Sequence, residues 1–93
     1  MIVGTATIDL VFYEPSSLKD KRQIIKSLIN RIKGKFNVSI GEIDFHDSWR
    51  NARIGVACVS TGTSHANSVI TSVINFIEKD GRVIIQDYSI EIF

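Results

Sequence analysis

The sequence contains a single cysteine and a single proline among its 93 residues. Since Cys58 has no second cysteine to pair with, the chain can form neither an internal disulfide nor a metal or redox site of the CxxC type. Small secreted domains usually depend on several disulfides, so we expect a cytoplasmic protein. Cys58 itself is expected to be a buried, inert thiol.

Long apolar runs are missing as well. Residues 1–14 are interrupted by Asp9, where a signal peptide would be apolar, and they stop short of the ~20 apolar residues that span a bilayer. We therefore expect no targeting segment and no membrane attachment. A length of 93 residues with 44% hydrophobic residues is enough for one modest core, so we predict a single domain over residues 1–93.

The net charge is only +1, but it hides a strong asymmetry. Residues 19–35 hold seven lysines and arginines against one aspartate, or +6, and the remainder holds four basic against nine acidic residues, or −5. Segregated charge in a nearly neutral protein favours oriented binding to an anion. The basic segment is therefore the first candidate for a binding surface.

The spacing of apolar residues predicts the order of elements, because strands alternate and helices repeat every three or four residues. We predict strands over 2–12, 36–45, 52–60 and 82–93, with a helix over 18–33 and a second helix that ends at 79–81. The order βαββαβ predicts an α+β, ferredoxin-like fold. It consists of a four-stranded antiparallel sheet with two helices on one face and the other face open.

Local signals refine the two ends of the first helix and the course of the second strand. Ser17 is expected to cap the first helix, with Asp20 completing a capping box. Gly34 can supply the left-handed residue that ends this helix. In the second strand the alternation slips after Gly41, which predicts a β-bulge or bend there.

Four motifs within residues 17–60 are similar to those of a known family: SLKDKR, FNVS, EIDFHDSW and IGVACVS. They resemble the bacterial YlxP-like family, a group of domains of unknown function, and the similarity extends over essentially the whole chain. Arg50 departs from the glutamine that follows the tryptophan in the family's pattern. The resemblance implies the ferredoxin-like fold and no particular reaction. Because members are often encoded among translation factors, beside a ribosome-binding factor, it also implies an RNA or ribosome context.

The segment GEIDFHDSW, residues 41–49, concentrates acidic residues and a histidine. In an extended chain Glu42, Asp44 and His46 share one face, where they could ligate a divalent cation. A metal site needs three or four ligands in a defined geometry, and no second histidine or cysteine stands at ligand spacing. We therefore predict no metal site and no cofactor.

A structural role for this segment is the stronger hypothesis. Trp49 is expected to lie over the turn as an anchor for the small core, with partner binding as the alternative. The polar residues are expected to form turn hydrogen bonds and ion pairs: Asp44 and Asp47 with backbone N–H groups, and Glu42 with Arg50 or Arg53.

Catalytic motifs are not recognisable. No serine, histidine and aspartate group stands in a nucleophile context, and VSTGTSH has too few glycines and no lysine for a phosphate loop. Small acylphosphatases share the predicted topology, but their glycine-flanked arginine cradle is missing. His65 is expected to be an exposed residue in the first turn of the second helix. We predict no catalytic residue, and an enzyme is the third-ranked hypothesis.

A basic stripe lies opposite the apolar face of the first helix: Lys19, Arg22, Lys26, Asn30 and Lys33. Like charges at this spacing repel by roughly a few tenths of a kcal/mol each, which suggests a use, although a solvated face is the alternative. Cations of this kind contact phosphates of structured RNA or the ribosome. We predict a nucleic-acid-binding surface made of Lys19, Lys21, Arg22, Lys26 and Lys33.

The last strand supports a second hypothesis. It is predicted to lie at a sheet edge, and residues 83–93 contain neither lysine nor proline to protect that edge, with apolar residues on both faces. We predict a homodimer through the last strand and the open sheet face. The alternatives are a monomer and an edge that another protein occupies. Two functions follow: an RNA- or ribosome-associated accessory domain, and an oligomerising or ligand-binding module that uses its sheet.

Overall fold

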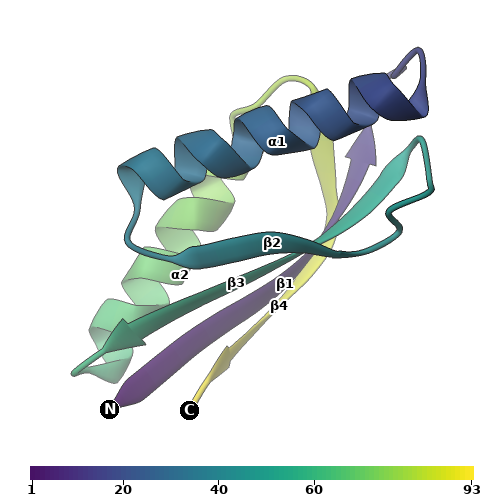
Figure 1. Cartoon of the computed structure of the whole chain (residues 1–93). Coiled ribbons are helices and arrows are strands. Elements are labelled where there is room, and N and C mark those ends of the chain that lie inside the picture. The colour runs from purple at the N-terminus through teal and green to yellow at the C-terminus, as the bar shows by residue number, and fades with distance from the viewer.

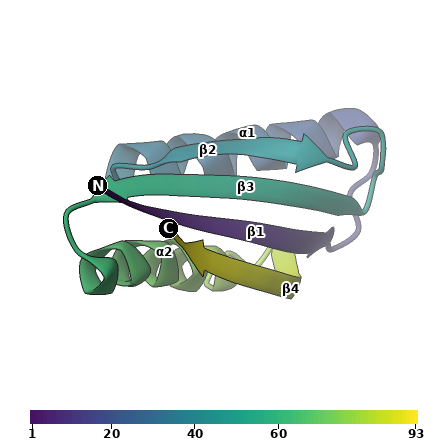
Figure 2. The ribbon, with the colours of Figure 1, turned by 90° about the horizontal axis from the view of Figure 1, so that it is seen from below.

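The computed structural model describes residues 1–93. Its elements follow the predicted order: β1 (Ile2–Phe12), α1 (Leu18–Lys35), β2 (Ser39–Asp44), β3 (Asn51–Ser60), α2 (Thr63–Glu78) and β4 (Val83–Ile92). The strands form one antiparallel sheet in the order β2-β3-β1-β4, and both helices lie on the same face of it (Figures 1 and 2). Neither helix is long and apolar enough to cross a membrane. The predicted α+β, ferredoxin-like fold is confirmed.

The core lies between the sheet and the two helices. Alternate residues of β1 and β3 are buried against the helix layer, and one cluster of 18 buried residues results, with Cys58 inside it as expected. Helix α2 lies close to β1 at Gly4, where an added Cβ would lie 3.3 Å from atoms of Ala66, Cys58 and Ile70. Gly4 therefore allows this helix to pack close to the central strand.

Helix α1 ends later than predicted, because Gly34 lies inside it and no glycine has a positive φ. The cap is Phe36, whose backbone is extended and whose N–H donates to the Ile32 carbonyl at 2.8 Å. The Phe36 ring packs edge-on against Phe76 of α2, with centroids 5.9 Å apart. Residue 36, predicted to begin the second strand, therefore belongs to the helix cap, where it also contacts the second helix.

Strand β2 carries a bulge at Ile43 and not, as predicted, at Gly41. Ile40 and Glu42 both point toward the helix layer, so the apparent slip in the alternation arises from a charged residue on the inward face. Ile43 lies on the open face above Gly55, where an added Cβ would come within 3.1 Å of it.

Strand β4 has a bulge at Gln86, which changes the expected distribution of its side chains. Beyond the bulge the apolar residues turn to the helix side and the polar ones to the open side: Tyr88, Ile90 and Ile92 against Asp87, Ser89 and Glu91. The prediction of apolar residues on both faces is therefore wrong for most of the strand. Only Ile84 and Phe93, at its two ends, are large apolar residues exposed on the open face.

Candidate nucleic-acid interface on helix α1

Helix α1 begins with the predicted cap. The Ser17 hydroxyl accepts a hydrogen bond from the Asp20 N–H at 3.0 Å. The Asp20 carboxylate in turn accepts from the Ser16 N–H at 3.1 Å, one residue earlier than in a regular capping box. The one acidic residue of the helix is thus engaged at its N-terminus and lies away from most of the basic residues.

Three lysines form a straight row along the outer face of α1. Lys19, Lys26 and Lys33 are exposed and seven residues apart, so the row is about 21 Å long and turns only about 20° per step. None of the three forms an ion pair. Arg22 beside the row has one contact, 3.6 Å to Asp47, which was predicted to bond backbone N–H groups instead. Such an exposed pair contributes little.

Lys21 does not belong to this surface, which corrects the predicted binding set. Its side chain has no exposed area, and its Nζ lies 3.0 Å from the Glu42 carboxylate. The same ammonium donates to the Phe45 carbonyl at 2.7 Å. Lys21 is therefore closed to a phosphate and instead ties the start of α1 to the end of β2.

Glu42 and His46 lie near each other, with His46 Nε2 4.0 Å from Glu42 Oε1, but Asp44 lies apart from them, so the three do not share one face as expected. The Glu42 carboxylate points inward to Lys21, contrary to the predicted arginine pair, whereas Asp44 lies 3.5 Å from Arg53 on the open side. No three histidine, cysteine, aspartate or glutamate side chains are arranged to hold a metal ion. The two carboxylates thus bind different cations on opposite faces of the sheet.

Arg53 organises the open side of this turn. It binds Asp9 of β1 with an Nε–Oδ1 distance of 2.7 Å, and that hydrogen bond raises the pKa of the guanidinium. The guanidinium also lies over the Phe45 ring, 4.9 Å from its centroid. Phe45 has a positive φ of 63°, and its N–H donates to Asp44 at 2.8 Å, as predicted for that aspartate. The turn is therefore held from both faces of the sheet.

Comparison with known proteins shows which family these features belong to. The family described as "Protein of unknown function (DUF503)" matches residues 3–90. The chain belongs to this family. A relative of the chain, the "Uncharacterized protein YlxP" of Bacillus subtilis (strain 168), is 35% identical over 77 residues, which are 83% of this chain and 84% of that protein. The predicted resemblance to YlxP-like proteins is confirmed.

The fold explains two of the motifs by which this DUF503 chain resembles its family. SLKDKR supplies Lys21 and EIDFHDSW supplies Glu42, and these two side chains meet in the buried ion pair. The charged residues at these two positions therefore have a structural role. The outer lysine row remains without one.

Trp49 does not anchor the core, contrary to the prediction. The residue is 54% exposed, and the core cluster includes no residue of the turn. Polar contacts close the turn instead: the Ser48 N–H donates to the Phe45 carbonyl at 3.0 Å, and the Asn51 N–H donates to the Ser48 hydroxyl at 3.2 Å. With these bonds in place, the turn needs no apolar anchor.

Sequence reasoning missed a contact between Ser60 and His65. The Ser60 hydroxyl lies 2.8 Å from His65 Nδ1 and accepts from the Gly62 N–H at 3.1 Å. His65 is exposed in the first turn of α2, as predicted, and no carboxylate contacts its ring. Since neither Ser60 nor His65 lines a cavity, the contacts serve to close the turn before α2.

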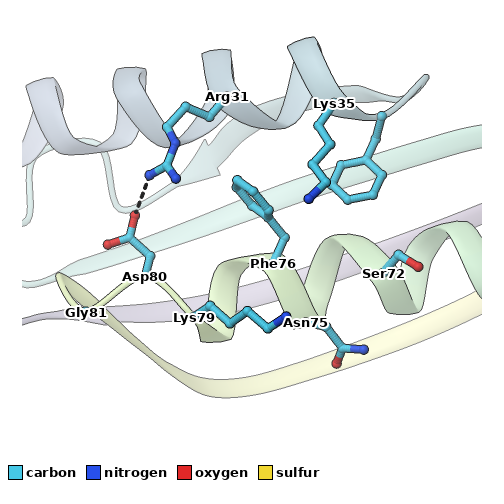
Figure 3. Close-up of a pocket in the computed structure, with 9 residues that line it drawn as sticks. Arg31, Lys35, Ser72, Asn75, Phe76, Lys79, Asp80 and Gly81 are labelled. Atoms are coloured by element: carbon cyan, nitrogen blue, oxygen red, sulfur yellow. Dashed lines mark ion pairs between the residues drawn. The ribbon is translucent and has the colours of Figure 1, made fainter.

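At the far end of α1, Arg31 reaches the loop that follows α2. Its guanidinium lies 3.6 Å from the Asp80 carboxylate, drawn as a dashed line in Figure 3. Asp80 is bound more closely by Arg82, at 2.6 and 2.9 Å, and its side chain is only 5% exposed. The hydrogen bond from Arg82, with smaller help from Arg31, lowers the pKa of the Asp80 carboxyl.

The lowered pKa gives a pH-dependent contribution to stability. The contribution is complete above the unfolded pKa of about 3.9 and is lost as the pH falls through the lower folded value, because only then does the native carboxylate take up a proton. Asp80→Asn, which keeps an oxygen for the Arg82 N–H, should therefore cost about 1 kcal/mol at neutral pH. Urea unfolding should show this difference shrinking below about pH 4. The control Glu91→Gln, at an exposed residue without an ion pair, should show neither effect; a cost for Asp80→Asn that is unchanged at pH 3 would contradict the assignment.

Proposed function

We propose that this protein is a noncatalytic accessory domain that binds the phosphates of structured RNA, in a ribosomal context, through the outer face of α1. The observation that carries the proposal is the row of Lys19, Lys26 and Lys33, three exposed ammonium groups on one line of a helix without carboxylate partners. Exposed cations of this kind can contact several phosphates of a folded RNA. The resemblance to a family encoded among translation factors supports the ribosomal context.

The unpaired state of the row is informative because acidic residues are available in the rest of the chain. Several of them bind other cations: Asp9 and Asp44 face Arg53, and Asp80 faces Arg82. Only Asp47 approaches the outer face of α1, through Arg22. The positive potential of that face is therefore not cancelled within the molecule, and phosphate binding there would release condensed counterions from the RNA.

The sheet supports recognition by shape and not by base stacking. RNA-recognition motifs stack bases on aromatic residues of the central strands. Here the outward residues of β1 contain no aromatic ring: Val3, Thr5, Thr7, Asp9 and Val11. Recognition is therefore assigned to the helix and to the phosphate backbone.

Filter binding of a labelled RNA hairpin tests the proposal. Retention should be clear at low salt and fall steeply toward physiological salt. Each phosphate contact should add about 0.7 to 0.9 to the steepness of the fall of log K with log salt. Retention that does not depend on salt, or no retention at low salt, would leave the row as a solvated surface only.

Self-association is the second candidate function, and one group of residues favours it. Val59 and Phe93 are 68% and 67% exposed, and both neighbour Val3 across the open face. This apolar group on the open face, Val59, Val3 and Phe93, ends at β4, the edge strand whose outer backbone groups have no partner strand. We propose that a second copy pairs with this edge and covers the apolar group, giving a homodimer through β4 and the sheet face.

Sedimentation decides this proposal. The expected result is a dimer of the 10.4 kDa chain at micromolar concentration, which Val59→Glu converts to monomer by placing a charge in the buried interface. Tyr13→Glu, at an exposed residue in the connection after β1, should leave the dimer intact. A single 10.4 kDa species that does not change on dilution would rule the dimer out.

A further inference from the structure

A cavity of about 660 Å³ opens between the second half of α1 and the end of α2 (Figure 3). Its size is within the range of pockets that hold small ligands. The lining includes three basic side chains, Arg31, Lys35 and Lys79, and one acidic side chain, Asp80, so its formal charge is +2. None of these basic residues belongs to the predicted binding set.

Aromatic rings hold two of the cations in place. Phe76 rises between Arg31 and Lys35, with the guanidinium carbon and the ammonium each 5.2 Å from its ring centroid (Figure 3). Lys35 also lies 5.8 Å from the centroid of Phe36. A ring quadrupole attracts a cation without neutralising it, so the N–H groups keep their capacity to bind an anion.

The acidic residue of the lining does not cancel this charge. The Asp80 carboxylate is almost fully buried, and it is bound by Arg82, which is not one of the residues that line the cavity. Lys35 and Lys79 form no ion pair at all. The cavity therefore presents two unpaired ammonium groups and one partly paired guanidinium.

The cavity is separate from the outer lysine row. At about 100° per residue, Arg31 and Lys35 lie about 120° to 160° around α1 from Lys19, on the side that faces α2. Arg31 contacts Asp80 and Lys35 contacts Phe76, which confirms that placement. The two cationic surfaces can therefore be altered independently.

We propose that this cavity binds a nucleoside phosphate, with the phosphate on the Lys35 and Lys79 ammonium groups and the base against the Arg31 guanidinium that covers Phe76. Guanidinium planes and aromatic rings both serve as stacking platforms for bases. The Ser72 hydroxyl and Asn75 amide, which also line the cavity, offer hydrogen bonds to a base edge. A free nucleotide and the phosphorylated end of an RNA strand present the same chemistry.

Titration of the ¹⁵N-labelled full chain with AMP, adenosine and inorganic phosphate tests the site. AMP should give saturable amide shifts within 31–36 and 72–81, and adenosine and phosphate alone should each bind at least about tenfold more weakly, since each lacks half of the contacts. The double variant Lys35→Gln and Lys79→Gln should weaken AMP binding by at least about tenfold. The matched control Lys19→Gln and Lys26→Gln should change it by less than about twofold.

Two RNA oligonucleotides of one sequence, with and without a 5′-phosphate, identify the source of the ligand. Because both strands contact the outer lysine row equally, a 5′-phosphate that tightens strand binding, with shifts in 31–36 and 72–81, assigns the site to a strand end. No gain from the 5′-phosphate, with AMP still bound, assigns the site to a free nucleotide; either result supports the site. The proposal is overturned if neither AMP nor the phosphorylated strand gives saturable shifts, if adenosine binds as tightly as AMP, or if the control pair weakens AMP binding as much as the cavity pair. Because the outer row is intact in the cavity variant, hairpin retention by that variant tests the proposed function separately.

Discussion

Lys21→Met is expected to lower the free energy of unfolding by about 3 kcal/mol, the cost of leaving one partner of a buried ion pair alone. The substitution keeps most of the side-chain length but removes the ammonium that binds Glu42 at 3.0 Å and the Phe45 carbonyl at 2.7 Å. The Glu42 carboxylate, 13% exposed, would then lack its close cation, and the carbonyl would lose its donor. Urea unfolding measures the effect.

Two further variants separate the ion pair from a general effect of methionine. Lys19→Met makes the same change at an exposed lysine and should alter stability by no more than about 0.5 kcal/mol. Adding Glu42→Met to Lys21→Met removes the stranded charge and should recover at least about half of the loss. If Lys21→Met costs no more than Lys19→Met, the buried pair does not stabilise the contact between α1 and β2.

Replacing Lys19, Arg22 and Lys26 together with glutamine should weaken hairpin RNA binding by about a hundredfold at 0.1 M salt. Three lost phosphate contacts should also reduce the slope of log K against log salt by about two to three. The fold should be retained, because the three residues are exposed and glutamine is a good helix former. Filter binding across a salt series gives both quantities, and circular dichroism checks the fold.

The control must carry the same change in net charge at another place. Lys35, Arg50 and Lys79 are exposed residues outside the outer row, and their replacement with glutamine also removes three charges. With a hairpin that carries no terminal phosphate, the proposed cavity site has no phosphorylated strand end to bind. This variant should then keep hairpin binding within about threefold of the parent, because no contact of the lysine row is lost. An equal loss in both variants would mean that net charge, and not the outer face of α1, governs binding.

Local patterns were sufficient to predict the order of the elements and the layers of the fold. The alternation in β1 and the helical spacing in α1 and α2 directly reflect which side of each element is buried, so they can be read without knowing the partners. The Ser17 cap is equally local, because donor and acceptor lie three residues apart. The basic outer face of α1 was also visible, since exposure there follows from the helical period alone.

Features that depend on a distant partner could not be predicted in the same way. Gly34 stayed helical because Phe36 caps the helix and packs on Phe76, a contact between the two helices. The bulge in β4 moved its apolar residues to the helix side, which depends on the register with β1. In both cases a local preference was weaker than packing against another element.

The sequence by itself determined the fold class, the buried faces and the line of lysines along α1, because each follows from the period of one element. Only the tertiary structure decided which charges are free. It placed Lys21 in the interior, because the Glu42 carboxylate on the inward face of β2 binds the Lys21 ammonium there. It also brought Arg31 and Lys35 of α1 together with Lys79 around one cavity. Whether two charges pair depends on the distance between them in the folded protein. The residue period of a single helix or strand carries no information on that distance.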